Sequence, residues 1–144
     1  MKRLKIIPFF LIALSVYACD DIFEQDISKS KIDILAPKSN SVVKDSNVKF
    51  IWDIVPGADR YRITIVSPSF KNINRIIADE VIIPDSLAYI ISFDREMPGG
   101  NYEWRLKGEN TNYQLMTGIM AFSVENPEEK DPESPEEPEI PEGQ

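Results

Sequence analysis

Alternation of large apolar and polar side chains is the feature that most limits the folds open to this chain. It is clearest in residues 102–107, where Tyr, Trp and Leu alternate with Glu, Arg and Lys. The same period of two recurs at residues 47–53 and 60–66, as in strands that bury one face. A helix needs a period near 3.6 residues, and residues 32–126 show no convincing stretch of that kind. The pattern therefore predicts strands.

Turn-forming residues divide residues 32–126 into short apolar runs. Pro56-Gly57 and Pro98-Gly99 are the clearest turns. About seven antiparallel strands at this spacing predict an all-β fold, a seven-stranded sandwich of two sheets, with an up-and-down barrel as the alternative. The expected strands are residues 32–35, 47–53, 60–66, 75–83, 87–93, 102–107 and 116–124.

Aromatic side chains are expected to supply much of the core of this domain. The chain has one cysteine, so the disulfide that links the two sheets of many immunoglobulin domains cannot form. Each aromatic side chain buries roughly 150–250 Å². The residues expected inside are Phe50, Trp52, Tyr61, Tyr102, Trp104 and Phe122.

Three stretches resemble a fibronectin type III domain. KFIW at residues 49–52 and PGADRYRI at residues 56–63 look like its strands B and C, and residues 98–110 look like its E–F turn and strand F. The resemblance implies that Trp52 packs centrally and that the Tyr102 hydroxyl bonds back to the backbone near residues 96–98. Residues 67–74 fit less well and look like an insertion beside strand C.

Residues 1–18 have the pattern of a secretory signal peptide. MKRLK is positively charged and is followed by about thirteen apolar or small residues, too few for the roughly 20 that cross a bilayer as a helix. Val16-Tyr17-Ala18-Cys19 resembles a bacterial lipobox. That resemblance implies lipidation of Cys19 with diacylglycerol and acyl chains such as palmitate, and cleavage before it. Residues 19–31 are then expected to be a tether.

The residues after Cys19 leave the choice of membrane open. Asp20 and Asp21 follow the cysteine directly. In some bacteria an Asp at this place retains a lipoprotein at the inner membrane, and in others acidic residues here mark export to the cell surface. The acidic tail and the predicted sandwich lead us to favour the outer membrane or cell surface. The whole arrangement resembles small envelope lipoproteins of Gram-negative bacteria.

Residues 127–144 form a Pro- and Glu-rich tail. The tail holds eight acidic residues, one lysine and five prolines. Such a composition favours extended polyproline II segments and buries little apolar surface, so we expect disorder. A solvated spacer is the plainer interpretation of the tail, and partner binding is the alternative.

Residues suited to catalysis or metal binding do not form recognisable motifs. The chain has no histidine and no Cys-x-x-Cys pair, which removes the commonest general base and the usual zinc ligands. Asp79-Glu80 and the pair Asp94 and Glu96 are expected to be solvated. The net charge of −8 and the lack of a basic stripe argue against nucleic-acid binding. We expect no enzyme activity, cofactor or metal.

Two functions remain open from the sequence. The first is a membrane-anchored, non-catalytic lipoprotein that acts as an interaction or scaffold module at the cell envelope, with a protein or glycan partner. The alternative is a surface glycan-binding accessory lipoprotein. It depends on Phe70, Tyr89 and Tyr113, aromatic residues expected near the surface, and requires that their rings share one exposed face.

Overall fold

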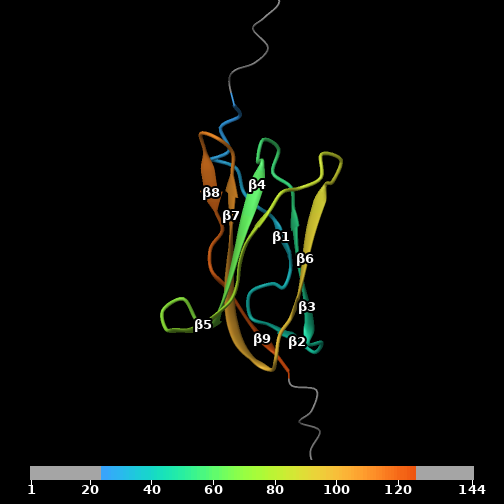
Figure 1. Cartoon of the computed structure of the whole chain (residues 1–144), viewed down its shortest axis with the longest axis vertical. Helices are drawn as coiled ribbons and strands as arrows, with labels where there is room; N and C mark the ends of the chain where they lie inside the picture. Colours follow the sequence, from blue (N-terminus) through green and yellow to red (C-terminus); the bar gives the residue numbers. More distant parts are fainter. Residues whose placement is uncertain (1–23, 126–144) are drawn as a thin grey trace, which may run out of the picture.

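The computed structural model describes residues 24–125, and all regular secondary structure in this part is β-strand (Figure 1). No helix of the described part is long and apolar enough to cross a membrane. The strands are β1 (Ile34–Ala36), β2 (Ser41–Val43), β3 (Asn47–Asp53), β4 (Arg60–Pro68), β5 (Ile73–Ile82), β6 (Ile90–Glu96), β7 (Gly100–Glu109), β8 (Gln114–Met116) and β9 (Met120–Val124).

The strands form two sheets. The smaller sheet has the order β1-β3-β6, and the larger has the order β2-β9-β7-β4-β5 with β8 paired to β7. The all-β, two-sheet prediction is therefore confirmed. β5 and β6 each pair with a single neighbour, so each forms an edge of its sheet.

The core lies between the two sheets and is largely aromatic. Phe50 of β3 is in edge-to-face contact with Trp104 of β7, with ring centroids 4.9 Å apart, and also contacts Phe122 of β9. Edge-to-face pairs of this kind add to the stabilisation from burial alone. Trp52 and Tyr61 contact each other further along the core. The alternation in β3, β4 and β7 thus places its apolar residues inside, as predicted.

Two side-chain roles implied by the fibronectin type III resemblance are present. Trp52 is completely buried in the core. The Tyr102 hydroxyl donates a hydrogen bond to the Pro98 carbonyl at 2.7 Å, which fixes the turn before β7 against the strand itself.

The strand count and one pairing differ from the prediction. The described residues form nine strands instead of seven. β2 was not expected, and it pairs with β9 in parallel. The run at residues 116–124 is divided between the end of β8 and β9. Regular backbone pairing with β7 is interrupted at Thr117, where the Thr117 hydroxyl accepts a hydrogen bond from the Leu106 N–H at 2.9 Å. The side chain thereby replaces a backbone partner at this position.

The expected insertion beside strand C is instead a hairpin. β4 runs to Pro68 and β5 begins at Ile73 in antiparallel pairing, so a short loop joins them. The register shifts between the pairs Ile65–Ala78 and Val66–Ile76. Ile77 is therefore the extra residue of a β-bulge, which bends the strand locally.

Candidate interaction surfaces

The N-terminal segment is packed on the domain, although residues 19–31 were expected to be a tether. Ile27 is 0% exposed and belongs to the core. The Glu24 carboxylate accepts hydrogen bonds from the backbone N–H groups of Thr111 and Asn112, each at 2.9 Å. The Thr111 N–H bond lowers the pKa of Glu24 below its ordinary value of 4.5. Residues 24–31 are therefore part of the domain.

Asn110 is the buried polar residue that holds this segment in place. Its Nδ2 donates to the carbonyls of Gln25 and Gly57, at 2.8 and 2.9 Å. Gly57 has φ of 87°, and a Cβ there would lie 2.8 Å from the Gln25 Cβ. Only glycine fits this close approach without strain. Asn110 therefore joins the N-terminal segment, the β3–β4 turn and the β7–β8 loop.

These contacts define one end of the sandwich, which we call the N-terminal end. The chain leaves β9 at the opposite end of the sandwich (Figure 1), and Glu125 is the residue that follows this strand. The Tyr89 carbonyl accepts a hydrogen bond from the Ile54 N–H at 2.9 Å, so the β5–β6 loop meets the β3–β4 turn there. A shallow cavity of about 290 Å³ lies between this loop and turn. The N-terminal end consists of residues 24–27, 54–59, 83–89 and 110–113.

The β5–β6 loop carries unusually exposed apolar side chains. Leu87 is 86% exposed and Tyr89 is 88% exposed, and Ile83 is also largely exposed. The sandwich leaves these side chains outside its core, although Ile83 and Leu87 fell within apolar runs of the sequence. Exposed apolar patches are a common feature of surfaces that bind other molecules or membranes, so this loop is a candidate interaction surface.

The structure does not bring Phe70, Tyr89 and Tyr113 together. Phe70 is half-buried, and the Arg105 guanidinium lies 4.6 Å from its ring centroid. The Phe70 N–H also bonds the Glu103 carboxylate, near the start of β7, whereas Tyr113 follows the end of β7. Six residues of β7 beyond Glu103 alone span roughly 20 Å at about 3.3 Å per residue. The three rings therefore do not share one exposed face.

The outer face of the larger sheet carries paired charges. Arg62 Nε lies 3.1 Å from Asp79 Oδ1, and Arg60 Nε lies 3.0 Å from Glu109 Oε2. Lys107 also pairs with Glu109. Hydrogen bonds from Lys107 and Arg60 lower the pKa of Glu109 below its ordinary value. The Glu109 carboxylate is thus stabilised in its ionised form.

The carboxylates expected to be solvated take part in exposed ion pairs. Asp94 pairs with Lys49 at 3.5 Å, and Glu80 pairs with Arg95 at 3.3 Å. Within residues 24–125, no group of three or more Asp, Glu, His or Cys side chains could hold a metal ion.

The outer edge of β5 is a second apolar surface. Ile73, Ile76 and Val81 are each at least half exposed on this ten-residue strand. A long edge strand presents backbone groups to which another chain can pair. At the bulge, the Ile77 carbonyl is occupied by Arg95 of β6, whose Nη2 lies 2.8 Å away. The remaining edge of β5 is covered by no other strand of the described part.

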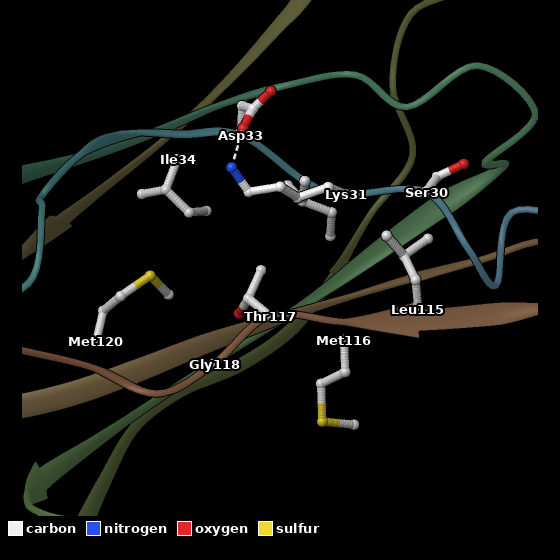
Figure 2. A pocket seen from close by; sticks show the side chains of 10 residues that line it. Ser30, Lys31, Asp33, Ile34, Leu115, Met116, Thr117, Gly118 and Met120 are labelled. Atoms are coloured by element: carbon white, nitrogen blue, oxygen red, sulfur yellow. Dashed lines mark ion pairs between the residues drawn. The ribbon is translucent and has the colours of Figure 1, made fainter.

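A pocket of about 390 Å³ opens between the N-terminal segment and the β8–β9 connection. Figure 2 shows Lys31 reaching Asp33 at one wall, with Thr117 and Met120 on the other. The Lys31 ammonium and the Asp33 carboxylate are 2.8 Å apart, and this bond raises the Lys31 pKa. The two ionisable groups of the lining thus pair with each other.

Comparison with known proteins identifies no family from sequence. No family model matches the chain, and no curated protein matches it. Among solved structures, the fold is similar to the fibronectin(III)-like modules of CbhA from Clostridium thermocellum. That similarity has a TM-score of 0.43 at 8% sequence identity and covers 66% of this chain and 96% of the other.

Cys19, the expected lipidation site, lies outside the described residues, as do the expected signal peptide and the acidic tail. The signal for the packing of residues 24–31 was weak in the sequence. Ile27 is an isolated apolar residue within the polar run EQDISKSK. A single apolar residue matches no strand pattern, so sequence reasoning missed this contact.

Proposed function

We propose that this protein is a lipid-anchored, non-catalytic interaction or scaffold module of the bacterial cell envelope, acylated at Cys19. The observation that carries the proposal is the bonding of the Glu24 carboxylate to Thr111 and Asn112. It joins the domain firmly to the chain segment that follows the lipobox-like sequence. A fibronectin type III-like domain attached in this way is suited to presenting a surface at a membrane.

The β5 edge supports the interaction role. It combines exposed apolar side chains with a strand edge that no other strand of residues 24–125 covers, and partner chains bind such edges by adding a strand. We propose that the partner is a protein with an extended segment. The outer membrane or cell surface is the proposed location, as the sequence analysis favours.

The anchor is tested by Cys19→Ala in the organism that makes the protein. We expect this variant to lose metabolic labelling with palmitate and to leave the membrane fraction. Ser15→Ala is the matched control, because it changes the apolar run but keeps the residues of the lipobox. Retained labelling and membrane association in Cys19→Ala would overturn the anchor.

The partner surface is tested by crosslinking in intact envelopes and purification of the protein with its partners. Ile76→Lys with Val81→Lys should remove a partner that binds the β5 edge, because both substitutions place charge on that edge. Val42→Lys is the control, since Val42 is similarly exposed on β2 at the other side of the larger sheet. If the wild type, the Ile76→Lys/Val81→Lys double variant and Val42→Lys all recover the same partners equally, the β5 edge is not the binding surface.

A glycan-binding accessory role is not proposed. It was motivated by Phe70, Tyr89 and Tyr113 acting together, and Phe70 lies near the start of β7, away from Tyr113 beyond the end of that strand. Stacking on a sugar also needs a free aromatic face, whereas the Phe70 ring lies against Arg105.

A further inference from the structure

We propose that the N-terminal end of the domain rests on the bilayer and places the side chains of Leu87 and Tyr89 in its interfacial region. This inference rests on the proposed lipid anchor at Cys19. It goes beyond anchoring, because it assigns a membrane-contacting surface to the folded domain and fixes which end faces the lipid.

The first argument is the length of the connection. Only residues 20–23 lie between Cys19 and Glu24. A fully extended chain gains at most about 3.6 Å per residue, so Glu24 lies within roughly 18 Å of an acylated Cys19. The end of the sandwich that carries Glu24 is therefore held close to the membrane, whatever path the connection takes.

The second argument is the attachment of Glu24 to the domain. Its carboxylate bonds Thr111 and Asn112, and Gln25 is bonded to Asn110. Ile27 then enters the core. The described chain thus offers no flexible stretch between Glu24 and the sandwich. The chain between the proposed anchor and the first residue bonded to the domain is therefore limited to residues 20–23, which keeps this end of the domain near the lipid.

The third argument is what this end exposes. Leu87 and Tyr89 are among the most exposed apolar residues of the described part, and they lie on the β5–β6 loop at the same end. Leucine gains from leaving water, and tyrosine combines an apolar ring with a hydroxyl suited to the headgroup level. Ile83 begins the same loop and is also largely exposed.

The charges at this end indicate the kind of lipid. Asp85 lies within the loop, and Asp59 lies in the adjacent β3–β4 turn. These carboxylates are repelled by anionic headgroups, whereas insertion of Leu87 and Tyr89 needs no charge. We therefore commit to a zwitterionic lipid surface. The opposite end, with the β4–β5 loop and Glu125, then points away from the membrane.

The test uses the full acylated protein in vesicles of phosphatidylcholine. The thiol of an acylated Cys19 is blocked, so Leu87→Cys gives a single site for a polarity-sensitive fluorophore. Lys71→Cys, on the β4–β5 loop at the far end, is the matched control. We expect blue-shifted emission and at least a threefold loss of iodide quenching at position 87 on vesicle binding, and no change at position 71. Core tryptophan emission checks folding.

Several results would overturn the inference. Equal quenching at positions 87 and 71 would show that the N-terminal end does not touch lipid. Protection of position 87 in native membranes but not in protein-free vesicles would show a protein occupant. If the fluorophore at position 87 is protected from iodide only when the vesicles contain anionic lipid, the assignment to a zwitterionic lipid surface is wrong. Mass spectrometry of the N-terminal peptide separates these results from failure of the anchor. An unacylated chain would contradict both the lipid anchor and the membrane contact, whereas an acylated chain without protection at position 87 would contradict the membrane contact alone.

Discussion

Arg95 donates a hydrogen bond from Nη2 to the backbone carbonyl of Ile77 at 2.8 Å, and thereby joins the edges of the two sheets. Ile77 is the bulged residue of β5, so its backbone falls out of register with β4. The Nη1 of the same guanidinium bonds Glu80. The Arg95 side chain therefore supplies a hydrogen-bond donor to the carbonyl at the β5 bulge and connects β5 to β6. This contact should make the centre of the β5 edge stiffer than an edge without such a bond.

Arg95→Ala should lower the free energy of unfolding by about 1 kcal/mol, the usual net value of such a hydrogen bond at a partly exposed site. Urea denaturation measures this change. Lys49→Ala is the control, because it removes an exposed ion pair to Asp94 at 3.5 Å and should cost less than about 0.5 kcal/mol. Equal effects of the two substitutions would mean that the bond to Ile77 contributes nothing of its own.

Two tyrosine-to-phenylalanine substitutions should differ in cost. The Tyr61 hydroxyl accepts from the buried Val55 N–H at 2.6 Å, so Tyr61→Phe leaves that donor without a partner and should cost about 2 kcal/mol. The Tyr102 hydroxyl donates to the carbonyl of exposed Pro98, which water can solvate in Tyr102→Phe. That change should cost about 1 kcal/mol. Thermal denaturation should show a larger loss of stability for Tyr61→Phe than for Tyr102→Phe. A larger loss for Tyr102→Phe would contradict this account.

Phe50→Ala should lower the free energy of unfolding by about 3–5 kcal/mol, because it opens a cavity in the core. Phe50 contacts the rings of Phe93, Trp104 and Phe122 at once. Leu87→Ala is the comparison, since Leu87 is exposed on a loop and its truncation should change stability by less than about 0.5 kcal/mol. Urea denaturation measures both changes. If Phe50→Ala lowers the free energy of unfolding no more than Leu87→Ala does, the two sheets pack less closely than described.

Acid should loosen the N-terminal segment through Glu24. Its pKa is lowered in the folded protein, mainly by the Thr111 N–H bond. A lowered pKa means that the bond stabilises the fold fully above the ordinary value of 4.5 and is lost as the pH falls through the lower folded value. In NMR spectra, the amide protons of Thr111 and Asn112 should titrate with a midpoint below 4.5.

Glu24→Gln provides the control for this titration. The neutral amide cannot titrate, so the shifts of Thr111 and Asn112 should no longer follow pH in the acidic range. A wild-type midpoint at or above 4.5 would contradict the lowered pKa. Persistence of the titration in Glu24→Gln would assign it to another carboxyl group.

The sequence predicts this fold where side chains alternate over six or more residues. β3, β4 and β7 carry the inner aromatic residues at a period of two, and they lie where predicted. β2 and β8 have three residues each, too few for a period to show. Thr117 interrupts the last expected strand through a side-chain hydrogen bond, which a hydrophobicity pattern cannot reveal.

The candidate surfaces were harder to predict, because they depend on tertiary contacts. Phe70 has the sequence context of an exposed loop aromatic, but Arg105 and Glu103 hold it against the sheet. Tyr89 is exposed as expected, yet its place beside the β3–β4 turn follows only from the hydrogen bond to Ile54. Residues that are distant in sequence meet at this end through Asn110, which no local pattern indicates.

The central claim, a lipid-anchored domain, is tested most directly by the mass of the N-terminal peptide of the mature protein isolated from its native membranes. The account predicts a chain that begins at Cys19, with a diacylglyceryl group on the Cys19 sulfur. An unmodified Cys19 thiol, or a mature chain that still contains residues 1–18, would contradict it.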